Sequence, residues 1–287
     1  MRKLSTVILT ECCNKKCAYC PYAEVTSSLD LDLSLLHSSL WVFEKLNSSI
    51  IYLTGGEPGI VKEHVLDLLF SIEQVFAVTT NGLFLKKEYH KKYDNVRKIQ
   101  YHVDLNDVCF QRFNDSRVVY SVVITHSNIG QLESFLKHNS DIQFHINLMQ
   151  VKDSKFDGLR LEAVDVEKVI ELGAKYNNIY PERMNMLVNY SKNLNSTLQD
   201  QYVNACRNRI LYGLAVNLPR QTILACCRTS YTDPLSSIPL TDVNLNSILQ
   251  AKTPLSLFPG SVEMELPCDT CFRIKSGHQV LDMALRR

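Results

Sequence analysis

Four cysteines stand within nine residues near the start of the chain, in the stretch CCNKKCAYC at residues 12–20. Thiols this close together could form disulfides, bind a zinc ion or hold an iron–sulfur cluster. A tetrahedral zinc site usually pairs two C-x2-C units, and only Cys17 and Cys20 form one here. Cys13, Cys17 and Cys20 also make a C-x3-C-x2-C pattern. Three thiolates from one short loop can hold three irons of a four-iron four-sulfur cluster and leave the fourth iron open to a non-protein ligand.

A second group of cysteines lies in the last third of the chain, at Cys206, Cys226, Cys227, Cys268 and Cys271. On spacing alone, the C-x2-C pair at 268–271 with one or two distant cysteines suits zinc and an iron–sulfur cluster equally. Cys226 and Cys227 are adjacent, and in an extended segment their side chains point to opposite sides. Only one of these two is therefore needed as a ligand.

The bulk composition limits the classes of protein to which the chain can belong. At 287 residues and 45% apolar side chains, it is long enough for one large domain with a smaller one appended. Its 31 basic and 30 acidic residues nearly cancel, which argues against bulk nucleic-acid binding. The sequence shows no signal peptide and no apolar run near the ~20 residues that span a bilayer. We therefore expect a cytoplasmic protein without membrane association, whose ten cysteines are reduced thiols or metal ligands.

The first part of the chain alternates between strand and helix patterns. Apolar runs predict strands at 3–10, 49–56, 75–82, 98–105, 118–125 and 142–151. Helical spacing of apolar residues predicts helices at 34–46, 63–73, 128–139 and 165–176, the first of them capped by Asp32 or Ser34. Such alternation indicates parallel βα units. Six strands are fewer than the eight of a closed barrel. We therefore predict an α/β fold, a partial (β/α)6 barrel of parallel strands with a small cysteine-bearing C-terminal domain.

The domain boundary is expected near residue 180, which gives domains at 1–180 and 181–287. Beyond it, residues 206–227 have the pattern of a hairpin, and five prolines between 234 and 267 predict an irregular tail. Within the barrel, ligands gather at the carboxyl ends of the strands. The cysteine loop, TGGEP at 54–58 and TTNG at 79–82 follow the first three strands, so these segments are expected to meet at one edge of the sheet.

The cysteine loop resembles the signature of radical S-adenosylmethionine (SAM) enzymes, with Tyr19 just before the third cysteine. The resemblance covers roughly residues 4–155. It implies that Cys13, Cys17 and Cys20 hold the SAM-binding 4Fe-4S cluster and that Cys12 is a bystander. TGGEP matches the GGE motif of this family, whose Gly55, Gly56 and Glu57 would meet the SAM amino group. Glycines allow a close backbone approach, and a carboxylate pairs with an ammonium group.

Further residues at the strand ends are implied to lie near SAM or the substrate, namely Thr80, Asn81, Asp104, Thr125, Asn128 and Asn147. TTNG resembles the segment after the third strand that helps hold SAM. VVITHSNIGQL at 122–132 resembles the fifth-strand motif of the family. For Asp104, Thr125 and Asn128, an ordinary role as strand-end caps is the alternative reading.

The tail resembles, more loosely, the twitch and SPASM domains that follow the barrel in many radical SAM enzymes. Only five cysteines remain there, fewer than the seven of the SPASM pattern, so the resemblance implies one auxiliary 4Fe-4S cluster. Its expected ligands are Cys206, Cys226, Cys268 and Cys271. Zinc or a set of free thiols is the alternative. Cys227 and Cys109 are the candidates for giving a hydrogen atom to a substrate radical, a role excluded if replacing each one leaves product formation intact.

The resemblance implies an enzyme that cleaves SAM reductively to a 5′-deoxyadenosyl radical, which takes a hydrogen from the substrate. A peptide to be crosslinked, epimerised or oxidised is the preferred substrate, and dehydrogenation or rearrangement of a small polar metabolite is the alternative. A non-catalytic iron–sulfur protein for electron transfer or partner binding is the alternative of another class. The implied partner is a flavodoxin- or ferredoxin-type reductant. Because the chain begins almost at its first strand, we expect no leader-peptide-binding domain fused in front of it; this counts against a peptide substrate unless a separate peptide-binding protein supplies that domain.

Overall fold

A computed structural model describes residues 6–20, 22–23, 30–46, 48–148, 158–159, 161–181, 184, 215–224 and 237–251. The strands are β1 (Thr6–Thr10), β2 (Ile51–Gly55), β3 (Phe76–Thr80), β4 (Val96–His102), β5 (Val118–Ile124), β6 (Phe144–Leu148), β7 (Ala215–Asn217), β8 (Thr222–Leu224) and β9 (Ser237–Pro239). The helices are α1 (Leu33–Leu46), η1 (Pro58–Ile60), α2 (Glu63–Phe70), α3 (Leu83–Lys86), α4 (Tyr89–Lys92), α5 (Ile129–His138), α6 (Ala163–Tyr176) and α9 (Asp242–Gln250).

The strands pair in the order β6-β5-β4-β3-β2-β1-β7-β8-β9. β1 to β4 pair in parallel with one another, as do β5 and β6, and β7 adds in parallel to β1. β7, β8 and β9 pair antiparallel. An α/β fold with six parallel strands and a few antiparallel strands from the C-terminal part is therefore confirmed, and the hairpin expected within 206–227 is present as β7 and β8.

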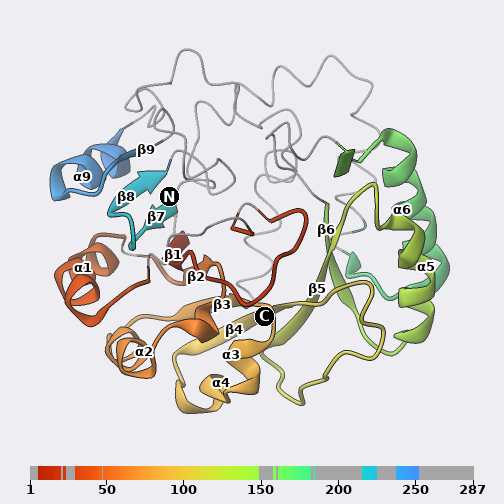
Figure 1. Ribbon diagram of the computed structural model, residues 1–287, viewed down its shortest axis with the longest axis horizontal. Helices are drawn as coiled ribbons and strands as arrows, with labels where there is room; N and C mark the ends of the chain where they lie inside the picture. Colours follow the sequence, from red (N-terminus) through yellow and green to blue (C-terminus); the bar gives the residue numbers. More distant parts are fainter. Residues whose placement is uncertain are drawn as a thin grey trace. The chain divides into compact units, whose positions relative to one another are not determined.

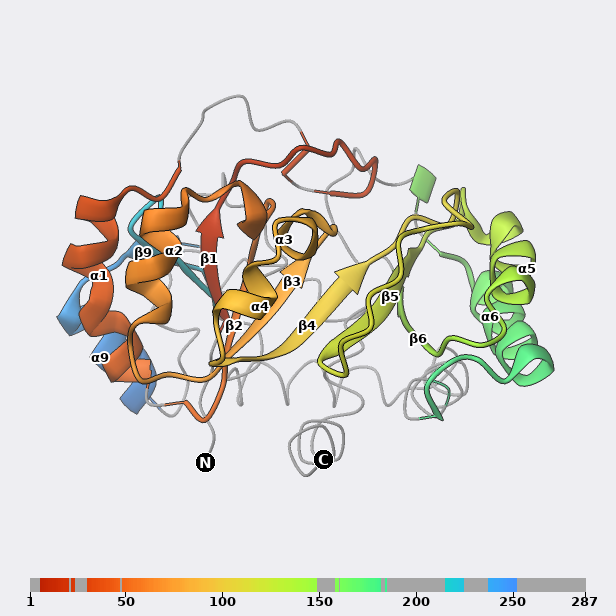
Figure 2. The same cartoon turned by 90° about the horizontal axis from the view of Figure 1, so that it is seen from below.

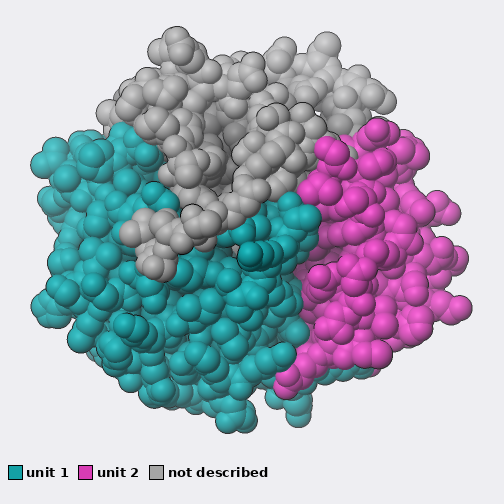
Figure 3. Space-filling model, viewed as in Figure 1, with its two compact units in different colours: residues 1–102, 112–119, 209–264 teal, residues 103–111, 120–208, 265–287 magenta. Residues whose placement is uncertain are grey.

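The chain divides into two compact units (Figure 3). Among the described residues, unit 1 contains those up to His102, Arg112–Val119 and the segments of β7, β8, β9 and α9. Unit 2 contains Val103–Gln111 and the residues from Tyr120 to Met184. The boundary expected at residue 180 stays a prediction.

The core of unit 1 forms around β1, whose Val7, Ile8 and Leu9 are at most 1% exposed. Both faces of β1 are covered, so the strand has a continuous apolar run rather than an alternating one. α1 and α2 lie side by side over the strands, and α9 lies next to α1 (Figures 1 and 2). Phe76 of β3 meets Phe43 of α1 and Phe70 of α2 edge to face. This packing fixes the strand ends from which the site is built.

The helix starts show where local sequence signals decide the structure. Asp32 caps α1, since its Oδ1 accepts the Leu35 amide at 2.7 Å. The tail, expected to be irregular, contains β9 and α9 instead. Thr241 starts α9 by accepting the Asn244 amide at 3.1 Å, and its helix buries Leu245 and Ile248. The capping threonine is a sequence signal that the surrounding prolines obscured.

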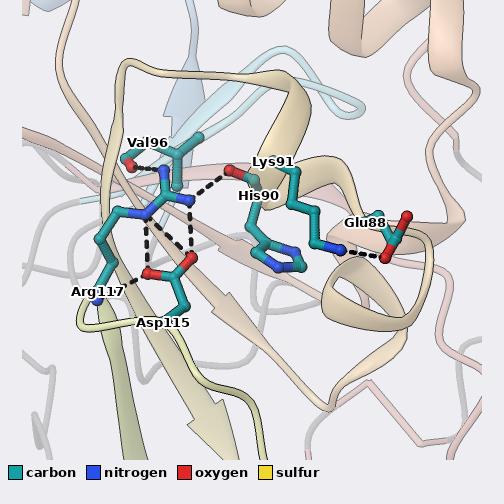
Figure 4. A network of polar contacts seen from close by, with 6 residues as sticks. All are labelled: Glu88, His90, Lys91, Val96, Asp115 and Arg117. Atoms are coloured by element: carbon teal, nitrogen blue, oxygen red, sulfur yellow. Dashed lines mark hydrogen bonds and ion pairs between the residues drawn. The ribbon is translucent and has the colours of Figure 1, made fainter.

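Arg117, directly before β5, fixes the start of this strand by its hydrogen bonds, and no helix separates β4 from β5 (Figure 4). Its guanidinium donates to the Asp115 carboxylate at 2.7 Å, to the His90 carbonyl at 2.6 Å and to the Val96 carbonyl at 3.0 Å. The guanidinium lowers the pKa of Asp115. In the same view Lys91 pairs with Glu88 on the surface of α4. Arg117 thereby joins the end of α4 to the start of β4 within unit 1.

In the part of the chain that the structure describes, no helix has both the length and the apolar character needed to cross a membrane.

Candidate functional site

The cysteine loop leaves the carboxyl end of β1, directly after Thr10 (Figure 2). Cys13, Cys17 and Cys20 are half-buried. The Lys15 amide donates to Cys13 Sγ at 3.4 Å, and the Cys20 amide donates to the Cys17 carbonyl at 2.9 Å. Burial raises the pKa of the Cys20 thiol to about 11, and the nearby thiols of Cys17 and Cys13 also raise it. Burial thus favours the protonated thiol at Cys20, and metal binding releases the proton of a cysteine ligand.

Backbone hydrogen bonds bind the GGE segment to the cysteine loop. The Gly56 amide donates to the Thr10 carbonyl at 2.7 Å, and the Glu57 amide donates to the Cys12 carbonyl at 2.8 Å. A Cβ on Gly55 would lie 2.2 Å from the Thr10 oxygen, and one on Gly56 would lie 2.0 Å from the Cys12 oxygen. The glycines are thus required by the close approach of two protein segments, whatever contacts they make with SAM.

Glu57 joins the GGE segment to TTNG. Its carboxylate is fully buried and accepts the Asn81 amide at 2.6 Å, the Thr80 hydroxyl at 2.8 Å, the Gly59 amide at 2.8 Å and the Phe84 amide at 3.2 Å. Burial raises the pKa of Glu57, and these donors offset part of the rise because they stabilise the carboxylate. Both oxygens already have protein partners, so its pairing with the SAM ammonium group stays a prediction.

Asn81 completes the connection between the three strand ends. Its Nδ2 donates to Asn14 Oδ1 at 2.8 Å and to Cys13 Sγ at 3.4 Å. The three segments expected to meet at one edge of the sheet therefore do so within unit 1. Asn14 was not among the expected site residues. Its only sequence signal is its place next to Cys13, which alone does not distinguish a functional asparagine from an exposed one.

The expected site residues of unit 2 make local contacts. Asp104 Oδ1 accepts the Asn106 amide at 3.0 Å, as in a turn. Thr125 and Asn128 cap each other, since the Thr125 amide donates to Asn128 Oδ1 at 2.8 Å and the Asn128 amide to Thr125 Oγ1 at 3.2 Å. These contacts match the reading as strand-end caps, and a role at SAM stays a prediction for all three.

Asn147 and Cys109, the other two expected site residues in this part of the chain, are not strand-end caps of this kind. The Nδ2 of Asn147, on β6, is buried and has no hydrogen-bond partner among the described residues. A buried amide donor of this kind can take an acceptor from a ligand. Cys109 is exposed.

The expected auxiliary site lies outside the described residues, together with Cys206, Cys226, Cys227, Cys268 and Cys271. Among the residues that are described, no group of three His, Cys, Asp or Glu side chains could hold one metal ion. Each thiolate of a four-iron cluster binds a different iron, so such ligands need not converge on one point.

The comparisons with known proteins give distant relatives, and no family model matches the chain. GTP 3′,8-cyclase of Staphylococcus saprophyticus is 29% identical over 159 residues, which are 50% of this chain and 46% of that protein. GTP 3′,8-cyclase of Shewanella denitrificans is 32% identical over 107 residues, which are 34% of this chain and 32% of that protein. The chain spans about half or less of the length of these relatives.

The similar solved structures cover more of the chain at lower identity. The anSMEcpe structure with bound AdoMet and Cp18Cys peptide has a TM-score of 0.54 at 12% identity and covers 95% of this chain and 87% of that one. Streptococcus suis SuiB bound to S-adenosylmethionine has a TM-score of 0.60 at 13% identity, covering 89% and 67%. SuiB bound to precursor peptide SuiA has a TM-score of 0.54 at 14% identity, covering 79% and 60%. At these identities the likeness concerns the fold.

The parallel strands place a C-x3-C-x2-C loop, a GGE segment and TTNG at one edge of the sheet, the arrangement expected from the resemblance to radical SAM enzymes. In these motifs, in its fold and in its distant sequence relatives, the chain is similar to proteins of the radical SAM superfamily.

Proposed function

We propose that the chain is an enzyme that cleaves SAM reductively and removes a hydrogen atom from a peptide substrate. The observation that carries the proposal is the hydrogen-bonded network that joins the three strand-end segments. Glu57 and Asn81 link the cysteine loop to the two segments that the family uses for SAM. A protein that only carried electrons would have no need for this arrangement.

The thiols of the cysteine loop and their hydrogen-bond donors are suited to binding an iron–sulfur cluster. Three half-buried thiols stand in one loop, and a backbone amide and the Asn81 amide group donate to Cys13 Sγ. Such N–H···S contacts stabilise thiolate ligands. Cys13, Cys17 and Cys20 would hold a 4Fe-4S cluster. Once bound, the cluster would supply the electron for the reductive cleavage of SAM.

A peptide is the preferred substrate because two of the similar structures carry one, the Cp18Cys peptide and the precursor peptide SuiA. The sequence relatives favour a second candidate, a small polar metabolite, since they are named for action on GTP. An auxiliary cluster at Cys206, Cys226, Cys268 and Cys271, and hydrogen donation by Cys227 or Cys109, remain parts of this proposal.

The first experiment measures 5′-deoxyadenosine after anaerobic incubation of the cluster-loaded, reduced chain with SAM. Cys13→Ser removes a proposed ligand, and Cys12→Ser changes the neighbouring cysteine outside the pattern. We expect the wild type and Cys12→Ser to form the product and Cys13→Ser to form none. A wild-type chain that keeps its cluster but forms no 5′-deoxyadenosine with SAM and any candidate substrate would support the non-catalytic alternative.

The substrate class can be tested by deuterium transfer. An extract from cells grown in deuterated medium is separated by size into a peptide fraction and a small-metabolite fraction. Each fraction is added to the reaction, and deuterium in 5′-deoxyadenosine is measured by mass spectrometry. We expect transfer from the peptide fraction. Transfer from the small-metabolite fraction alone would overturn the peptide assignment and leave SAM cleavage intact.

A further inference from the structure

Glu11 is a fully buried carboxylate at the root of the cysteine loop, directly after β1 and two residues before Cys13. Neither the motifs nor the proposed function assign it a role. A carboxylate loses its hydration on burial, so it must be paired and hydrogen-bonded to persist there. Its partners lie more than 200 residues later in the sequence.

Two residues of the hairpin formed by β7 and β8 hold Glu11. Arg220 Nε donates to Oε1 at 2.6 Å, and Arg220 Nη2 donates to Oε2 at 2.8 Å, which makes a two-point contact. Asn217 is itself fully buried, and its Nδ2 donates to Oε1 at 2.8 Å. The Arg220 amide donates back to Asn217 Oδ1 at 3.2 Å, so the two residues orient each other.

The hairpin is fixed independently of this contact. Ile8 pairs with Asn217 in the parallel register of β1 and β7, and the Leu218 amide donates to the Ile8 carbonyl at 3.1 Å. Ile8, Ala215 and Leu224 form a buried cluster. At the turn, Gln221 adopts a left-handed φ of 51° and its Nε2 donates to Ser39 Oγ of α1 at 3.0 Å. Arg220 is therefore presented to Glu11 by a firmly anchored turn.

On its other side, Glu11 adjoins the backbone that carries the cluster ligands. The Cys12 amide donates to Thr10 Oγ1 at 3.0 Å, and the Cys12 carbonyl accepts the Glu57 amide. The loop root is thus held by three contacts at two consecutive residues, Glu11 and Cys12. Two of these contacts come from β1 and the GGE segment. The contact at Glu11 comes from the C-terminal hairpin.

We infer that Arg220 and Asn217 are positioning residues for the SAM-binding cluster and that, by holding Glu11, the C-terminal hairpin sets the root of the loop that carries Cys13, Cys17 and Cys20. The inference rests on the proposed function, because it assigns that loop to the cluster. It makes the N-terminal site dependent on a segment more than 200 residues away in the sequence. Residues that orient metal ligands in this way tune both metal affinity and the electronic state of the metal.

Arg220→Met keeps a long side chain but removes the guanidinium. The matched control is Arg117→Met. Arg117 is in the same unit and makes a similar two-point contact, with Asp115 (Figure 4). The side chain of Arg117 is 26% exposed and that of Arg220 is 27% exposed. The control touches no residue of the cysteine loop. Both variants lose a two-point ion pair of a partly buried arginine, although Asp115 is 15% exposed and Glu11 is not exposed. An effect of losing the ion pair on stability should therefore appear in both, and the double variant described below removes the added cost of leaving the Glu11 charge buried.

The first readout is the electron paramagnetic resonance signal of the reduced cluster that changes when SAM is added. We expect Arg220→Met to lower this signal about tenfold or more and Arg117→Met to leave it nearly unchanged. Arg220→Lys, which keeps one donor, should restore part of it. Equal losses in both methionine variants, or a full signal in Arg220→Met, would overturn the inference.

Two further measurements keep the inference testable if a variant is unstable or the cluster is absent. Glu11→Gln/Arg220→Met removes the buried charge and should regain stability without regaining the signal; recovery of both would show that only charge balance matters. In the metal-free chain, amide hydrogen exchange at residues 11–20 should be faster in Arg220→Met than in Arg117→Met, and equal rates would contradict the inference. A wild type that forms no SAM-responsive cluster would instead refute the proposed function.

Discussion

Glu57 shows how one side chain can organise a site through hydrogen bonds to the surrounding backbone. Its carboxylate accepts four donors from two strand-end segments, and no part of it is exposed. A carboxylate at the position after two glycines is therefore used by the protein's own hydrogen bonds, whatever it contributes to SAM binding. Its Oε1 accepts from backbone amides at the start of η1 and α3, which have no acceptor within their own helices.

Glu57→Gln tests whether Glu57 acts by accepting hydrogen bonds within the protein or by direct contact with SAM. The amide nitrogen of glutamine would face either the Asn81 amide or the donors at Oε1, which places a donor against a donor. We expect a loss of about 1–3 kcal/mol in the free energy of unfolding, with weaker SAM binding, because TTNG loses its fixed position. Urea unfolding and calorimetric SAM titration measure the two effects. Unchanged stability with lost SAM binding would mean that the carboxylate acts on SAM directly.

The residue scale is also where sequence-based prediction reached its limit. The three cysteines, the glycines, Glu57 and Asn81 could be chosen because their types and spacing carry a family pattern. Glu11 could not, since its partners Asn217 and Arg220 lie more than 200 residues away and only the pairing of β1 with β7 brings them together. Asn14 shows the same limit over a shorter distance. Long-range pairing leaves no mark in a single sequence.

At the element scale, the end of β2 and the cysteine loop depend on the absence of a side chain at Gly56. Gly56→Ala would place a Cβ 2.0 Å from the backbone oxygen of Cys12, and backbone cannot move aside as a flexible side chain can. We expect Gly56→Ala to destabilise the chain by about 1–3 kcal/mol and to lower cluster content. Thermal unfolding and iron content per chain after reconstitution measure both.

Gly130→Ala is the matched control for this substitution. Gly130 lies in α5, and a Cβ there would meet nothing within 4 Å. Because alanine loses less conformational freedom than glycine on forming a helix, we expect the control to stabilise the chain by about 0.5–1 kcal/mol without any change in iron content. If Gly56→Ala behaved like Gly130→Ala, the close approach of β2 to the cysteine loop would not be needed.

A second element contact, between the start of α5 and the start of α6, predicts a pH dependence. His126 Nδ1 lies 2.8 Å from Asp165 Oδ2, and Asp165 also accepts the Glu162 amide in the capping box of α6. The hydrogen bond with Asp165 and its charge raise the pKa of His126, and the charge of Glu162 adds to the rise. The contact should therefore stabilise the fold below the unfolded pKa of about 6.5 and lose that contribution as the pH rises through the folded pKa.

His126→Asn tests this pH dependence. We expect the wild type to be more stable than the variant in mildly acidic buffer, with the difference shrinking as the pH rises into the alkaline range. Urea unfolding of both proteins across this range gives the difference in free energy at each pH. A difference that stays constant or grows with pH would show that protonated His126 is not the stabilising species.

At the scale of the whole molecule, the strand and helix pattern predicted the fold class well. Six parallel strands, the helices α1, α2, α5 and α6 and the hairpin of β7 and β8 follow from hydrophobic periodicity, which packing reinforces. The short helices α3 and α4, and α9 in the tail, could not be found because they offer few periodic positions or are surrounded by prolines. The addition of β7 to the edge of β1 depends on tertiary pairing, which periodicity does not encode.

The iron content of the chain distinguishes one bound cluster from two. A triple variant removes the first site by replacing Cys13, Cys17 and Cys20 with Ala. It keeps the expected ligands of the second site, Cys206, Cys226, Cys268 and Cys271. We expect the anaerobically reconstituted triple variant to keep about four irons and matching acid-labile sulfide, because the remaining four thiolates suffice for one cubane. Cys12→Ala serves as the control and should keep the iron content of the wild type.

A triple variant without iron, or with zinc, would mean that the tail cysteines form no auxiliary cluster. The substrate would then have to react with a single cluster and SAM, which would favour chemistry that needs no second site for electrons.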